Sequence, residues 1–182
     1  MQKAFLRLTP GQAQNAQGLI LFRLALWVGT QELDKVNAVS GQPGRQNLLK
    51  AKDRWPGSMQ PLGEGVYMLG DPDAVNRVNW ASRVGQFSGT FGPGLGPVWI
   101  GIHPPEGNPL GIRSFDFGIH QDDNQSVSPG TSGCVGIQGQ KGDADYARLS
   151  QVVGWFQKYD IQKLVVDYGL GTVYKPGAKP AA

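Results

Sequence analysis

Residues 118–137 read GIHQDDNQSVSPGTSGCVGI, and they contain the only cysteine of the chain and one of its two histidines. His120 ends the strand-like run 114–120, and Cys134 follows fourteen residues later in a turn of small residues. A structural cysteine is usually buried among bulky apolar side chains, whereas little bulk surrounds this sulfur. Two interpretations are open: an inert thiol in a loop, or a thiol kept accessible for chemistry.

Alternation along the run 114–120 predicts two different faces. Phe115, Phe117 and Ile119 share one face, and Ser114, Asp116, Gly118 and His120 share the other. A histidine at a strand end and a thiol in a glycine-rich turn suit a Cys–His pair, because only the thiolate attacks a carbonyl carbon. The backbone N–H groups of Gly133 and Cys134 could then stabilise an oxyanion. Such a pair predicts a thiol pKa below its ordinary value.

Length and composition bound the fold. The chain has 182 residues with 40% hydrophobic residues, which predicts one globular domain over residues 1–182, with a flexible tail at 175–182. Its 27 glycines and 13 prolines favour a mainly β structure with many turns. A single cysteine excludes an internal disulfide.

The pattern of apolar residues predicts a mainly antiparallel sheet assembly with one helix. The helix is expected from an N-cap at Asp143 to about Tyr159. The region 41–63 is expected to be loop. The expected strands are 4–9, 19–28, 33–40, 65–70, 98–103, 114–120 and 161–168, with 172–174 as a possible extension of the last.

Charge and residue spacing limit the classes of partner and cofactor that the sequence predicts. The net charge is +3, and the segment with Arg45, Lys50, Lys52 and Arg54 is either a solvated loop or a site for an anionic polymer. No nucleic-acid-binding motif is present, so no nucleic-acid partner is predicted. The histidines and the cysteine are not spaced as ligands, so neither a metal nor another cofactor is predicted.

The apolar run 19–28 is too short to span a bilayer and contains Arg23, which predicts a buried strand and no membrane span. It also lacks the basic start of a signal peptide. We therefore expect a protein made in the cytoplasm that leaves by host lysis, a secretion machine or a virus particle.

The motif residues resemble the catalytic signature of L,D-transpeptidase (YkuD-type) domains. The matching segments are Ile119-His120 and Thr131-Ser132-Gly133-Cys134-Val135, with softer matches at Val39-Ser40-Gly41 and at residues 61–67, which end at Tyr67. The resemblance covers about residues 19–174, the expected core of the domain. It implies an L,D-transpeptidase-like β-sandwich with one helix in the C-terminal half packed on it. It also implies a cysteine nucleophile that forms a thioester with peptidoglycan stem peptides.

The resemblance assigns Cys134, His120 and Gly133 to catalysis, and Arg113, Ser132, Thr131 and Tyr67 to substrate binding. The chain has Ser132 and Gly136 where the commonest family pattern has His and a polar Arg or Asn. This variant looks closer to phage proteins and secreted antibacterial effectors, so the expected site of action is the cell wall, with virion or tail components as further partners. Hydrolysis and transpeptidation both stay open.

A second class of function is a virion or wall-binding module that keeps the fold with little or no catalysis. Three further assignments have two interpretations each. His103 is either a loop residue or an alternative base, and Asp122 and Asp123 are either solvated or orient His120. Trp55 and Trp80 are either core or loop anchors or the floor of a glycan groove.

Overall fold

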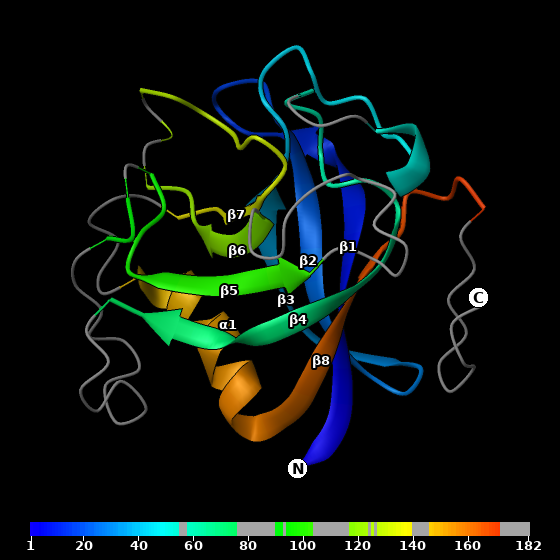
Figure 1. Cartoon of the computed structure of the whole chain (residues 1–182), viewed down its shortest axis with the longest axis vertical. Helices are drawn as coiled ribbons and strands as arrows, with labels where there is room; N and C mark the ends of the chain where they lie inside the picture. The colour runs from blue at the N-terminus through cyan, green and yellow to red at the C-terminus, as the bar shows by residue number, and fades with distance from the viewer. Residues whose placement is uncertain are drawn as a thin grey trace.

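The computed structural model describes residues 1–54, 58–75, 90–92, 94–103, 117–123, 125, 127–139 and 146–171. Within them the chain forms eight strands, one α-helix and one 3-10 turn (Figure 1). The elements in order are β1 (Gln2–Gln14), β2 (Ile20–Val28), β3 (Gln31–Val39), η1 (Ala51–Asp53), β4 (Gly65–Ala74), β5 (Val98–His103), β6 (Phe117–Gln121), β7 (Val135–Ile137), α1 (Ala147–Lys158) and β8 (Tyr159–Val166).

The strands form a closed barrel in the order β1-β2-β3-β7-β6-β5-β4-β8. Strand β8 closes it, because it pairs with β1 in parallel and with β4 antiparallel. The pair β6–β7 is also parallel, and the other pairs are antiparallel. The mainly β, mainly antiparallel prediction is confirmed, but the predicted β-sandwich is wrong in its finer detail: the first and last strands pair and close the sheet on itself.

Apolar alternation places one face of each strand inside the barrel. In β2, the side chains of Phe22, Leu24 and Leu26 are buried, and Arg23 between them is exposed. The same interior receives Ile100 of β5 and Ile119 of β6, both fully buried. The run 19–28 is therefore a buried strand, as its sequence predicted. No helix in the described part of the chain has the length and apolar character needed to cross a membrane.

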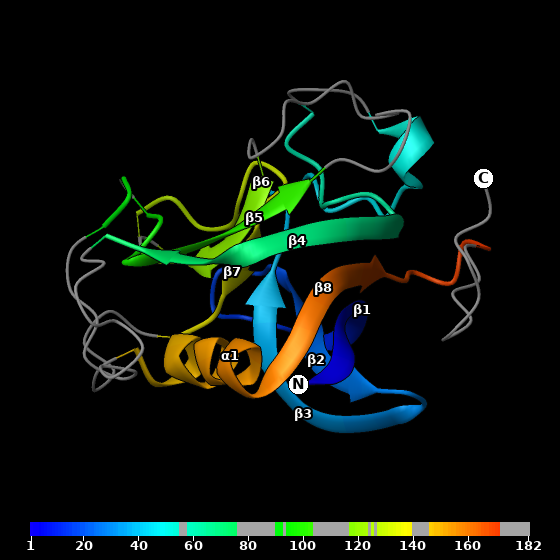
Figure 2. The ribbon, with the colours of Figure 1, turned by 60° about the horizontal axis from the view of Figure 1, so that its bottom comes forward.

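The helix α1 packs against the barrel beside the start of β8 (Figure 2). It buries Leu149, Val152 and Phe156, which recur at helical spacing as predicted. Trp155 belongs to the same buried face, and its indole N–H donates to Asp34 of β3 at 2.9 Å. The helix begins at Ala147 with Tyr146 as its N-cap, so the N-cap expected at Asp143 is wrong. Tyr146 has a left-handed backbone (φ 52°) and makes no side-chain cap hydrogen bond.

Several strand limits differ from those expected. Strand β7 was not predicted at all, since three residues after a turn carry too little pattern. Strand β1 precedes the expected core limit at residue 19 and is a full member of the barrel. Strand β6 is described from Phe117, and the predicted residues 114–116, 172–174 and 175–182 lie outside the described part.

The closing strand gives a test of the barrel. Leu164 of β8 is fully buried in the core cluster and pairs with both Leu6 and Tyr67. We expect Leu164→Ala to lower the free energy of unfolding by about 2–5 kcal/mol, because it leaves a cavity. Gln162→Ala, at an exposed position of the same strand, should change it by less than about 0.5 kcal/mol. Urea denaturation measures both, and equal effects would contradict the closed-barrel core.

Candidate functional site

Parallel pairing of β6 with β7 brings the two motif residues together. His120 is the register partner of Gly136, and Ile119 is that of Val135. Cys134 directly precedes β7, and its sulfur is close to the backbone amide of Gly118. Strands lie about 4.8 Å apart and rise about 3.3 Å per residue, so the Cα atoms of Cys134 and His120 are roughly 8 Å apart. The register thus places the two residues on the same face of neighbouring strands, and a contact between their side chains stays a prediction.

Two hydroxyl groups hold the cysteine turn. Ser40 Oγ donates to the Cys134 carbonyl at 2.8 Å, and Thr131 Oγ1 donates to the same oxygen at 2.6 Å. Thr131 Oγ1 also accepts the N–H of Gly41 and of Gly133, at 3.2 and 3.3 Å. Thr131 was predicted to bind substrate, but its side chain is buried and bonded within the turn. Its observed role is to hold the backbone at Cys134.

Arg54 is the site residue that sequence reasoning missed. Its side chain is only 3% exposed, so the expectation of a solvated basic loop is wrong for this residue. Its Nη2 donates to the Ser132 carbonyl at 3.2 Å, and its guanidinium lies 4.8 Å from the centre of the Phe117 ring. Gly133 has φ +119°, and a Cβ there would overlap Nη2. The glycine before the cysteine therefore makes room for Arg54.

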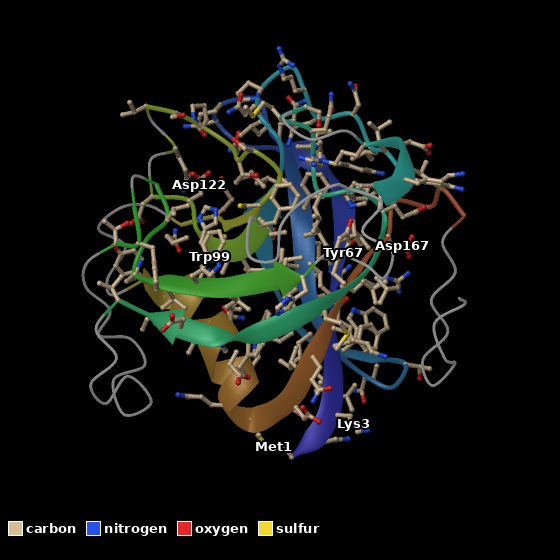
Figure 3. All side chains as sticks on the ribbon, in the orientation of Figure 1. Met1, Lys3, Tyr67, Trp99, Asp122 and Asp167 are labelled. Atoms are coloured by element: carbon tan, nitrogen blue, oxygen red, sulfur yellow. The ribbon has the colours of Figure 1, made fainter. Side chains whose placement is uncertain are left out.

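His120 is buried at 3% exposure under a tryptophan. The Trp99 ring stacks on the imidazole with centroids 5.6 Å apart and planes 8° apart. Figure 3 shows Trp99 beside Asp122, on the side of the barrel formed by β5 and β6. A Cβ at Gly118 would lie 2.5 Å from the Trp99 ring, so only glycine permits this packing.

The hydrogen bond of His120 sets its tautomer. Nδ1 lies 2.8 Å from the Gln121 carbonyl, an acceptor, so Nδ1 carries the proton and Nε2 is the basic nitrogen. Burial lowers the pKa of His120, and the backbones of Gln121 and Gly94 oppose that shift. The ring is therefore neutral near pH 7 and able to accept a proton.

The thiol differs from its sequence expectation. Cys134 is 9% exposed and belongs to the buried core cluster, and burial raises its pKa to about 11. The Gly118 amide and the charge of Arg54 oppose this rise. The sequence predicted an open thiol with a lowered pKa. The structure instead shows a covered thiol that is protonated at neutral pH, because the loss of hydration outweighs both stabilising contacts.

The other predicted substrate residues are spread over the molecule. Tyr67 is fully buried inside the barrel, where its hydroxyl donates to the Gly63 carbonyl at 2.6 Å. It is a core residue rather than part of an exposed site. Ser132 is exposed beside Cys134 and contributes its carbonyl to Arg54. Arg113, Trp55 and Trp80 lie outside the described residues.

The remaining candidates have other surroundings. His103 pairs with Met68 of β4 at the far end of β5, two strands away from β7. Asp122 is buried and accepts from Gln138 Nε2 at 3.0 Å. Asp123 accepts from the Tyr146 hydroxyl at 3.2 Å. The described contact of His120 Nδ1 is with a carbonyl rather than with either aspartate.

The described residues include no group of three His, Cys, Asp or Glu side chains that could hold a metal ion. Comparisons with protein-family models, curated proteins and solved structures give no match to this chain. The fold and the site thus define a β-barrel protein with one packed helix and a covered thiol between a neutral histidine and a buried arginine.

Asp122 gives a pH test of this region. Burial raises its pKa to about 6. Between pH 3.8 and 6 the unfolded carboxyl ionises while the folded one keeps its proton, so stability falls as pH rises through this window. At pH 7.5 we expect Asp122→Asn to have a free energy of unfolding up to roughly 3 kcal/mol above that of wild type, measured by urea denaturation. This difference should shrink towards pH 4. The same difference at both pH values would contradict the raised pKa.

Proposed function

We propose that this chain is a Cys134-dependent enzyme that acts on peptidoglycan stem peptides through a thioester. The observation that carries the proposal is the parallel β6–β7 pairing, which puts His120 and the cysteine on one face of neighbouring strands. The barrel interior takes the alternate residues Ile119 and Val135. By the same alternation the thiol and the imidazole share the other face of the two strands, where both are buried in the free protein.

The chemistry follows from the protonation states. Cys134 is a thiol and His120 is neutral at pH 7, so His120 Nε2 takes the thiol proton as Sγ attacks the peptide carbonyl. The carbon–nitrogen bond then breaks, and the imidazolium returns the proton to the leaving amine. Water or an acceptor amine attacks the thioester, the carbon–sulfur bond breaks, and the thiol is restored.

The raised thiol pKa shapes this mechanism. A thiol with a pKa of about 11 is not a resting thiolate, so proton removal has to accompany attack. The Gly118 amide, already next to Sγ, lowers the cost of negative charge there. This arrangement favours a reaction that starts only when a bound substrate completes the site.

A second candidate is a virion or wall-binding module without catalysis. The observation that favours it is the burial of Cys134 at 9% exposure within the apolar core cluster, as in a structural cysteine. In that case the thiol fills space between β6 and β7. The two candidate functions predict different effects of Cys134→Ala on peptidoglycan stem peptides.

The first experiment digests purified sacculi and analyses the muropeptides by mass. We expect wild type to change the stem-peptide pattern and Cys134→Ala to leave it unchanged, because no other residue can form the thioester. Val127→Ala is the control and should act like wild type, because this side chain is exposed in the loop before the cysteine turn. Unchanged patterns with all three proteins would favour the binding module.

The second experiment compares the histidines. We expect His120→Gln to reduce turnover about 10²–10⁴-fold, as for loss of a general base, while His103→Gln keeps most of it. Of the two histidines, only His120 lies on a strand that pairs with β7. Circular dichroism checks that both variants fold. Equal losses in the two variants would show that the base is wrongly assigned.

A further inference from the structure

Arg54 is a buried cation whose described partners are all uncharged. Its Nε donates to the Pro61 carbonyl at 2.9 Å, and its Nη2 donates to the carbonyls of Gln60 and Ser132 at 3.1 and 3.2 Å. The ion pairs found among the described residues are Arg7–Asp167 and Arg23–Glu32, neither of which involves this guanidinium. The positive charge of Arg54 therefore has no carboxylate partner in the described part of the chain.

The guanidinium also keeps two unused donors. Nη1 is buried and makes no hydrogen bond within the described residues. A buried charged group without compensation costs several kcal/mol, and a buried donor without an acceptor adds to that cost. The uncompensated charge and the unused Nη1 donors of Arg54 indicate that an anion or an oxygen acceptor binds to this guanidinium.

The uncompensated positive charge of Arg54 lies near the Cys134 thiol. The guanidinium lies against Phe117 on one side and against the backbone of Gly133, next to Cys134, on another. Its charge acts on the sulfur and lowers the cost of ionising it. The cation and the nucleophile are thus neighbours, even though 80 residues separate them in the sequence.

The other titratable groups around the thiol supply no positive charge above pH 7. From β6, His120 is neutral because burial lowers its pKa. From β4 and from the segment after β8, Tyr67 and Tyr168 keep their protons because burial raises their pKa values. Among these groups only Arg54 can balance negative charge on the sulfur.

We propose that Arg54 is the counter-ion of the negative charge that Cys134 Sγ carries when it reacts. The three carbonyl contacts hold the guanidinium beside Gly133 and Cys134, and Nη1 keeps donors that no described acceptor uses. His120 moves the proton, and Arg54 stabilises the charge left behind. This assignment concerns the thiol alone and needs no peptidoglycan substrate, so it stands or falls separately from the proposed function.

The test uses two alkylating reagents of similar size, neutral iodoacetamide and anionic iodoacetate. Because access to the covered sulfur is similar for both, the ratio of their rates reports local charge. In wild type we expect the iodoacetate-to-iodoacetamide ratio to exceed that of β-mercaptoethanol by tenfold or more. A ratio equal to that of the free thiol, or no labelling of the folded protein by either reagent, would overturn the proposal.

Variants then assign the charge to one residue. In Arg54→Met the ratio should fall to the free-thiol value, and iodoacetamide labelling at pH 8 should slow about tenfold, equal to a rise of about one pKa unit. Arg54→Lys keeps the charge, so its iodoacetate-to-iodoacetamide ratio should stay close to that of wild type. If Arg54→Met does not fold, a free-thiol ratio in Arg54→Lys would refute the proposal. His120→Gln should leave the ratio unchanged. A ratio that follows His120 instead of Arg54 would refute the assignment.

Discussion

Insertion of β8 between β1 and β4 is the constraint on which the rest of the structure depends. Its parallel register with β1 and its antiparallel register with β4 join the two ends of the sheet. Once the sheet is closed, each strand has an inner and an outer face, and apolar side chains such as Ile119 and Val135 must point inwards. Their neighbours His120 and Cys134 share the opposite face of β6 and β7, where both are buried. Closure thus determines which side chains share the face of the candidate site.

The site combines two opposing effects of burial. Burial protonates Cys134 and deprotonates His120, so the free protein holds both groups uncharged. The same burial makes the charge of Arg54 strong, because little water screens it. A neutral thiol beside a neutral base and a fixed cation can remain unreactive until a bound reactant lets charge form. The raised thiol pKa is therefore compatible with a nucleophile whose activation depends on its substrate.

Local patterns in the sequence predicted most of the strands and the helix. The run 98–103 is β5 as expected, and the helical spacing of Leu149, Val152 and Phe156 located α1. A barrel could not be distinguished from a sandwich, because strand pattern does not say whether the last strand pairs with the first. Strand β7 has three residues, too few for a period to show. The sequence placed His120 near the end of a strand and Cys134 in a glycine turn, and the structure has both features.

Arg54 could not be predicted, because a basic residue in a Gly- and Pro-rich loop has the same local pattern whether it is solvated or buried. Its burial depends on the carbonyl of Ser132, 78 residues away. Holding the turn requires only the three donor contacts that Nε and Nη2 already make to Pro61, Gln60 and Ser132. A purely structural contact would leave no reason to bury Nη1 and a full charge beside a thiol. The excess of donors over structural acceptors is what connects this residue to the chemistry of Cys134.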